Sequence, residues 1–104
     1  MAQFTLYENT NRDSKQAYPY FVDVQNDLLD SLNTRLVIPL TPASLLGENM
    51  ARLSPKAAIR GRDFFLLPHQ MTNVPVSALT RPCGSLAHLR NDIVSAIDFL
   101  VTGI

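Results

Sequence analysis

Residues able to do acid–base or nucleophilic chemistry are few in this sequence and widely spaced. The 104 residues include two histidines, His69 and His88, and one cysteine, Cys83. The histidines lack the HxH or HxxxH spacing typical of a shared metal ion. A lone cysteine cannot form an internal disulfide or a multi-thiolate zinc site, and "RPCGS" matches no cysteine-hydrolase signature. We therefore interpret both histidines as solvated or locally hydrogen-bonded, and Cys83 as a small, half-buried residue beside a Pro82–Gly84 turn.

Three carboxylates lie close together in the sequence, at Asp23, Asp27 and Asp30. Carboxylate oxygens are the usual ligands of hard cations, so such a group can be a metal site. The remaining acidic residues are dispersed. We interpret the three carboxylates as a charged cluster at the edge of a loop rather than as a metal site.

A local run of basic residues is a second candidate for chemistry, through contacts with nucleic-acid phosphates. Its members are Arg52, Lys56, Arg60 and Arg62. The whole chain carries nine basic and nine acidic residues, however, and its formal net charge is zero. A protein that neutralises phosphates usually has a basic excess. The solvated tip of a hairpin is the interpretation that we favour for this run.

An enzyme needs a nucleophile or a base held within reach of a partner group. The sequence shows no such pair, no glycine-rich phosphate loop and no G-x-S-x-G elbow. We expect a protein that is not an enzyme and that has no metal and no cofactor. A protein that acts by contact needs an exposed apolar patch with a polar rim. Two segments offer one: "NDLLDSLNT", which puts Leu28 and Leu29 among polar residues, and the end of the chain, "DFLVTGI".

Two strands are predicted in the first part of the chain, where side chains of unlike polarity alternate. Residues 3–7 and 20–25 show the period of two that is typical of half-buried strands. Residues 8–19 between them are polar and rich in breakers, which predicts a loop. So short a connection favours an antiparallel meander over a βαβ unit.

The next segment, residues 35–40, is predicted to be a third strand. Pro39 cannot donate to a ladder hydrogen bond, which predicts a strand end or a sheet edge. Thr41 and Pro42 then predict the capped start of a single helical turn, and Gly47 its end.

A hairpin is predicted over residues 57–67, with Gly61 supplying a positive φ at its tip. Residues 64–67 are apolar on both faces, so this strand should be central in the sheet. Residues 74–79 predict a last strand, bent or placed at an edge by Pro75.

A helix after Ser85, which can cap it, is the strongest prediction of local structure. Its apolar stripe, with spacings of three and four, comprises Leu86, Leu89, Ile93, Ile97, Leu100 and Ile104. A packed stripe would also explain why the end of the chain need not fray. Short strands followed by one long helix indicate an α+β or barrel-plus-helix fold, and the length fits a single domain over residues 1–104.

The location of the protein is predicted from three features of the sequence. No stretch approaches the ~20 apolar residues of a membrane span. The start, "MAQFTLYENT", has no basic segment followed by an apolar one, as a secretory signal would. A single cysteine fits a reducing compartment. We expect a cytoplasmic protein without membrane contact.

Five segments, in order along nearly the whole chain, together carry a resemblance to a known family. They are "FVDVQ" at 21–25, "DLLD" at 27–30, "RLVIPL" at 35–40, "NVPVS" at 73–77, and "NDI..AI" at 91–97, which leads to a terminal Gly103-Ile104. In this order they are similar to the CcdB family of plasmid and chromosomal toxins, which poison DNA gyrase.

The resemblance implies a mainly antiparallel α+β fold: an SH3-like barrel of the CcdB/MazF type with a small sheet wing and a long C-terminal helix, in a homodimer. It implies a toxin–antitoxin module whose toxin is not an enzyme. Such a toxin binds the DNA gyrase A subunit and traps the cleaved gyrase–DNA complex, which blocks replication and transcription. A cognate antitoxin with a disordered segment releases the toxin, and operator DNA is reached only through the antitoxin complex.

The family's gyrase contacts, carried over by position, are Leu28, Leu29, Asp98, Val101, Thr102, Gly103 and Ile104. The best-known members have Asn, Phe and Trp at positions 98, 101 and 102. Thr102 loses a cation–π stack on a gyrase Arg, worth ~0.5–2 kcal/mol, and Asp98 could offset part of that by pairing with a basic side chain. Gly103 would let the backbone approach a partner closely. Burying Ile104 would contribute ~1.5–3 kcal/mol, unless it packs in the protein's own dimer interface.

Two other functions remain open from the sequence. A toxin of the same barrel shape can cleave messenger RNA, because fold alone does not decide function. That activity would use a basic groove with Arg60, Arg62 and His69. The other alternative is an inactive chromosomal copy that only binds antitoxin. The main argument for it is that Thr102 stands where the best-known family members have Trp.

Overall fold

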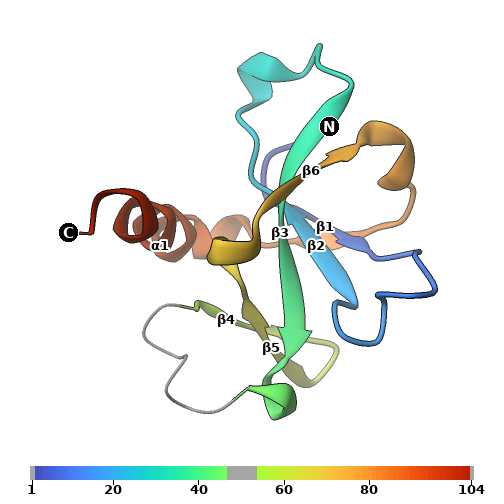
Figure 1. Cartoon of the computed structure of the whole chain (residues 1–104), viewed down its shortest axis with the longest axis vertical. Helices are drawn as coiled ribbons and strands as arrows, with labels where there is room; N and C mark the ends of the chain where they lie inside the picture. The colour runs from blue at the N-terminus through green and yellow to red at the C-terminus, as the bar shows by residue number, and fades with distance from the viewer. Residues whose placement is uncertain (1, 47–53, 104) are drawn as a thin grey trace.

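In the part of the chain that the structure describes, seven strands form one curled antiparallel sheet, and the α-helix packs against it (Figure 1). The computed structural model describes residues 2–46 and 54–103. The strands are β1 (Thr5–Glu8), β2 (Tyr20–Asp23), β3 (Thr34–Pro42), β4 (Lys56–Ile59), β5 (Arg62–Leu66), β6 (Thr72–Pro75) and β7 (Pro82–Ser85). The helix is α1 (Arg90–Thr102), and short 3-10 turns are η1 (Asp27–Leu29), η2 (Ala43–Leu45), η4 (Pro68–Gln70), η5 (Val76–Ala78) and η6 (Ala87–Leu89). The predicted α+β, barrel-like fold is confirmed.

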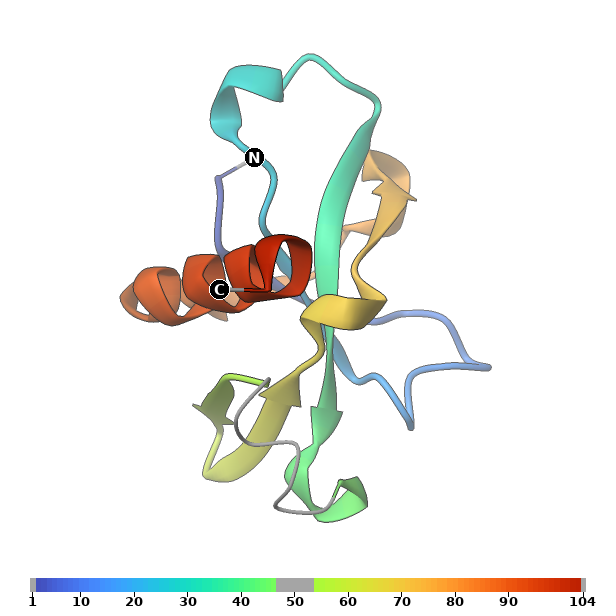
Figure 2. The same ribbon diagram turned by 60° about the vertical axis from the view of Figure 1, so that its left-hand side comes forward.

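The long strand β3 organises the sheet, whose order is β4-β5-β3-β2-β1-β7 with β6 also paired to β3. One edge of β3 pairs with β2. The other edge pairs with β6 along its first half and with β5 along its last three residues. Because β5 and β6 follow one another along the same edge, the β4–β5 hairpin forms a short arm at one end of β3 (Figures 1 and 2).

Pro39 lies in the middle of β3, so its predicted place at a strand end or a sheet edge is wrong. It pairs with Phe21 on β2, and its carbonyl accepts a hydrogen bond from the N–H of Leu67 at 3.0 Å on the other edge. The N and C=O groups of one strand residue point to the same side. The missing N–H therefore faces the gap between the last β6 pair, at Val37, and the first β5 pair, at Leu40. No ladder bond is lost there.

The predicted hairpin and its central second strand are confirmed. Arg60 and Gly61 have φ values of 52° and 79°, the left-handed pair that a two-residue type I′ turn requires. Strand β5 pairs with β3 on one side and with β4 on the other. Both faces of β5 are covered at its end, since Phe64, Phe65 and Leu66 are all buried.

Three local predictions are corrected. Thr41 and Pro42 belong to β3, and η2 begins at Ala43 without a side-chain cap; Gly47 lies outside the described residues. The strand predicted over residues 74–79 ends at Pro75. The residues predicted as a Pro82–Gly84 turn form β7, which pairs with the free edge of β1. "PCGS" has neither alternation nor β-branched residues, so only the neighbouring strand makes it a strand.

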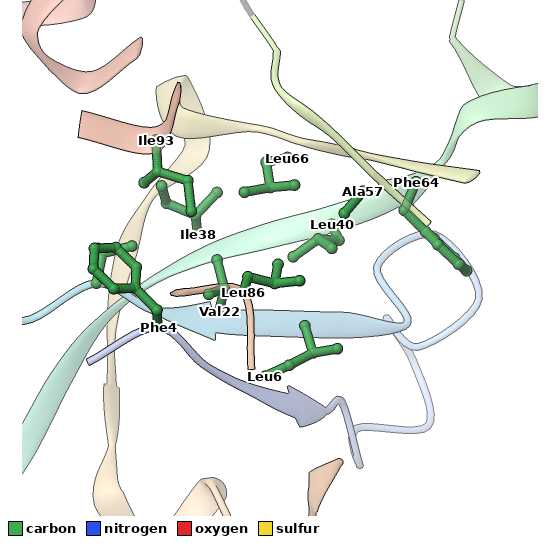
Figure 3. Close-up of a cluster of buried hydrophobic side chains, with 11 residues drawn as sticks. Phe4, Leu6, Val22, Ile38, Leu40, Ala57, Phe64, Leu66, Leu86 and Ile93 are labelled. Carbon is green, nitrogen blue, oxygen red and sulfur yellow. The ribbon is translucent and has the colours of Figure 1, made fainter. Parts of the chain in front are cut away.

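The main core lies between the sheet and the first turns of α1 (Figure 3). Its buried side chains include Phe4, Leu6, Val22, Ile38, Leu40, Leu66, Leu86 and Ile93. A second, smaller cluster of Tyr7, Val37 and Leu79 covers the opposite face. Strand β1 is therefore buried on both faces, not half-buried as predicted. The strand also starts one residue after Phe4, whose φ of 68° turns the chain into it.

The predicted helix starts later and packs over a shorter length than its stripe indicates. The Ser85 hydroxyl accepts a hydrogen bond from the N–H of Ala87 at 3.2 Å, and neither η6 nor α1 has a side-chain cap, so the predicted capping of the helix by Ser85 is wrong. Ile93 is fully buried, but Leu100 is 46% exposed, because the last turns of α1 extend past the sheet (Figure 1). Gly103 ends the helix with φ of 72°, and its N–H donates to the Phe99 carbonyl at 2.9 Å. This hydrogen bond caps the end of α1, where Leu100 is not buried.

Candidate functional site

The turn η1 presents the leucines predicted to form a contact surface. Leu28 is 89% exposed and Leu29 is 49% exposed, so their predicted exposure is confirmed. The side-chain oxygen of Asn26 accepts a hydrogen bond from the N–H of Leu28 at 2.8 Å and caps the turn. Leu32, which was not predicted as part of the surface, is a further exposed leucine of this loop, at 48%.

The last turns of α1 present the second predicted surface. Asp98, Val101 and Thr102 are spaced three and four apart and share one helix face, together with the exposed Val94. Val101 is 72% exposed. The Thr102 hydroxyl donates to the Asp98 carbonyl at 2.7 Å, so it is satisfied within the helix. Gly103 is exposed at the C-cap, and Ile104 lies outside the described residues.

The two surfaces lie on the same side of β3. Figures 1 and 2 both draw η1 beyond the helix, toward the upper end of the long strand, with the end of α1 below it. Residues 28 and 101 are far apart in the sequence, and only the sheet brings their elements to one side. The structure thus gives the protein two exposed apolar surfaces, each held by an ordered turn or helix.

The carboxylates at 23, 27 and 30 form a network around one buried arginine, so the prediction of a simple loop-edge cluster is wrong. Asp23 and Arg35 are both fully buried, and Arg35 Nε donates to Asp23 Oδ2 at 2.7 Å. Its two terminal nitrogens reach Asp30 at 3.1 Å and Asp27 at 3.5 Å. Residues 2–46 and 54–103 contain no group of acidic, histidine or cysteine side chains able to hold a metal ion.

The sequence did not predict a buried role for Arg35, because this residue has the pattern of a polar first residue of an apolar strand. The available signal was a lone arginine in "RLVIPL", soon after three carboxylates. Burial alone would lower the pKa of its guanidinium, but the hydrogen bond and charge of Asp23, with Asp27 and Asp30, raise that pKa overall. The guanidinium therefore remains charged in the core.

The residues considered for catalysis do not converge. Arg60 lies in the hairpin turn and pairs with Glu8 at 3.7 Å, and Arg62, the first residue of β5, lies over the Phe64 ring. His69 is in η4, beyond the other end of β5. Five strand residues at ~3.3 Å each place it well over 10 Å from Arg62.

Cys83 lies on β7 and is half-buried, as predicted, although in a strand and not beside a turn. Burial raises the pKa of its thiol, and the negative charge of Glu8 adds to the effect. A protonated thiol is a poor nucleophile. His88, in η6, is exposed on the polar side of its turn.

A polar cavity of about 450 Å³ lies beside the loop before β2. Arg12, Lys15, Arg81 and Glu8 contribute to its lining. Both views place this loop across the sheet from α1 (Figures 1 and 2). The cavity is therefore separate from the two apolar surfaces.

Comparison with known protein families gives a match that spans nearly the whole chain. The family model described as CcdB protein matches residues 3–103. The matched range includes η1, the buried network and α1, so both surfaces belong to the shared fold. No helix within the described ranges is long and apolar enough to cross a membrane. The chain belongs to the CcdB family, and is thus a toxin of a toxin–antitoxin module whose partner is an antitoxin.

Proposed function

We propose that this toxin binds the DNA gyrase A subunit and traps the cleaved gyrase–DNA complex, with no catalytic step and no cofactor of its own. Family membership supports the target, and one structural observation supports the mode of action. Leu28 and Val101, at 89% and 72% exposure, are large apolar side chains held out into solvent by ordered elements. Ordered, exposed apolar side chains with polar neighbours are typical of protein-binding surfaces.

The expected contact is made by both surfaces together. Fully burying one Leu or Val side chain contributes ~1.5–3 kcal/mol, so a partner that covers Leu28 and Val101 gains several kcal/mol before the costs of association. Asp98 adds a charge on the same helix face as Val101. Its carboxylate has no hydrogen bond or ion pair within the described ranges, so it is available to a basic side chain of the partner.

We also propose a homodimer. Leu100 continues the stripe of Ile93 and Ile97 but is 46% exposed, and Phe99 beside it is 47% exposed. Phe99 and Leu100 lie on a different face of α1 from Asp98 and Val101. A second copy of the chain can therefore cover Phe99 and Leu100 without blocking the Asp98–Val101 face. Light scattering of the purified protein at micromolar concentration should give twice the 11.6 kDa chain mass.

The test compares matched leucine and valine variants. Leu28→Ser and Val101→Ser should each require about tenfold more toxin to give the same yield of linear plasmid with purified gyrase, because ~1.4 kcal/mol of contact is lost. Leu45→Ser is the control: Leu45 is 62% exposed on η2, at the far end of β3 from η1 (Figure 1). It should act like the wild type.

The outcome also separates the alternatives. Wild-type activity in folded Leu28→Ser and Val101→Ser proteins would remove these residues from the site. Cleavage of messenger RNA without gyrase would instead support a ribonuclease toxin. A wild-type protein that binds antitoxin, and produces neither linear plasmid nor cut RNA, would be an inactive copy.

A further inference from the structure

We propose that Arg35 is the positioning residue of the Leu28–Leu29 surface, because its buried guanidinium holds the exposed η1 loop in one conformation. The use of that surface rests on the proposed gyrase binding. The anchoring itself rests on contacts within this chain. The two parts are therefore tested separately.

The η1 loop has no hydrophobic anchor of its own. Every residue from 26 to 33 is exposed, and η1 contains no buried residue. An eight-residue segment without a buried apolar side chain is normally among the most mobile parts of a fold. Its conformation must therefore be set by polar contacts with the sheet.

Arg35 supplies those contacts from a rigid position. Its side chain is fully buried on β3 and is fixed to Asp23 of the neighbouring strand β2 by the 2.7 Å bond. The remaining nitrogens point toward the loop, reaching Asp30 Oδ1 at 3.1 Å and Asp27 Oδ1 at 3.5 Å. Asp27 immediately precedes Leu28, and Asp30 immediately follows Leu29. One guanidinium thus contacts the residue on each side of the two leucines.

Backbone contacts complete the anchor. Arg35 also donates to the Gln25 carbonyl at 3.2 Å, and the Gln25 side-chain nitrogen donates to the Leu29 carbonyl at 3.2 Å. The N–H of Gln3 donates to Asp27 Oδ1 at 2.9 Å. Arginine suits the central place because its planar fork directs several donors outward at once, whereas a lysine ammonium offers a single point charge.

The first experiment measures anchoring in the full-length protein, without gyrase. Asp30→Ala removes the contact between Arg35 and Asp30 Oδ1. Because the Asp30 side chain is 54% exposed, the sheet should stay intact. Backbone amides in residues 27–33 should exchange about fivefold faster, the upper end of what a partly exposed ion pair contributes. The control is Asp63→Ala, since Asp63 is 55% exposed and pairs with Lys56 at 3.7 Å in the hairpin. Exchange in 27–33 should not change there, and unchanged exchange in Asp30→Ala would overturn the anchoring.

The second experiment is a double-mutant cycle for binding to the purified gyrase A subunit. Asp30→Ala should weaken binding about fivefold in the wild-type background. It should have almost no effect in the Leu28→Ala/Leu29→Ala background, because there is no longer a surface to position. An equal loss in both backgrounds would show that Asp30 contacts gyrase directly, and would overturn the positioning role.

A failure of the proposed function gives a different pattern. If the wild-type protein does not bind gyrase A, the gyrase proposal fails, and the exchange measurement still decides whether Arg35 anchors the loop. Arg35→Lys provides a further check. It keeps the charge but not the fork, so exchange in 27–33 should accelerate at least as much as in Asp30→Ala. Wild-type exchange in this variant would show that charge alone holds the loop.

Discussion

The Asp23–Arg35 pair should respond asymmetrically to the removal of its two members. Asp23→Asn leaves the guanidinium its contacts with Asp30 at 3.1 Å and with the Gln25 carbonyl at 3.2 Å. Arg35→Met leaves the Asp23 carboxylate fully buried, and within residues 2–46 and 54–103 its one remaining donor is the N–H of Gln25 at 3.0 Å. The arginine variant should therefore be the less stable of the two.

The expected magnitudes are large compared with the stability of a small domain. Removing one partner of a buried ion pair costs ~3–5 kcal/mol, which we assign to Arg35→Met. Asp23→Asn removes one charged hydrogen bond from a cation that keeps others, so we expect ~1.5–3 kcal/mol. Against a total stability of ~5–15 kcal/mol, Arg35→Met should lower Tm by more than about 10 °C.

Urea denaturation followed by circular dichroism measures both variants, at one fixed protein concentration because an oligomer's stability depends on it. The control is Asp63→Asn, where both partners of the pair with Lys56 are more than half exposed, and less than ~1 kcal/mol should be lost. A cost for Asp23→Asn equal to or above that for Arg35→Met would contradict the reasoning, because it would show that the carboxylate and not the arginine organises the network.

Three further outcomes are expected. Gly61→Ala should cost ~1 kcal/mol through its φ of 79° alone, since an added Cβ would meet nothing within 4 Å; an unchanged Tm would refute this. Ile93→Ala should cost ~2–5 kcal/mol in urea denaturation because Ile93 is fully buried, whereas a loss below ~1 kcal/mol would mean that α1 is not held by it. Burial and the charge of Asp23 raise the pKa of Tyr7 in the folded state. The contribution of Tyr7 to the free energy of unfolding is therefore complete below pH ~10 and is lost as the pH rises. Tyr7→Phe should flatten the fall in urea midpoint between about pH 9 and 11; an equal fall would exclude Tyr7 as its cause.

The sequence predicted those elements whose signals are local. The I′ hairpin depends on a glycine at its tip, and the exposure of Leu28 and Leu29 follows from their polar neighbours in a short loop. The antiparallel order of the first strands follows from the short connections between them. Each of these features depends on a few adjacent residues.

The predictions that failed depend on neighbours distant in the sequence. Pro39 is tolerated in a central strand because β5 and β6 leave a gap beside it. "PCGS" becomes β7 because β1 has a free edge. The stripe of α1 continues to Leu100 in the sequence, but the sheet beneath it ends sooner. Periodicity shows which side chains share a face, and it does not show how far the opposing surface extends.

For the candidate site too, some features follow from local sequence and others from contacts between distant residues. By itself, the sequence determined that the chain has two apolar segments in polar settings, and its family resemblance predicted a target for them. Only the tertiary structure decided that both lie on one side of β3, and that a buried arginine brackets the leucine pair. The physical reason is that an ion pair forms between groups that the sheet brings within about 3 Å, and strand pairing, which sets that distance, is not a local property of the sequence.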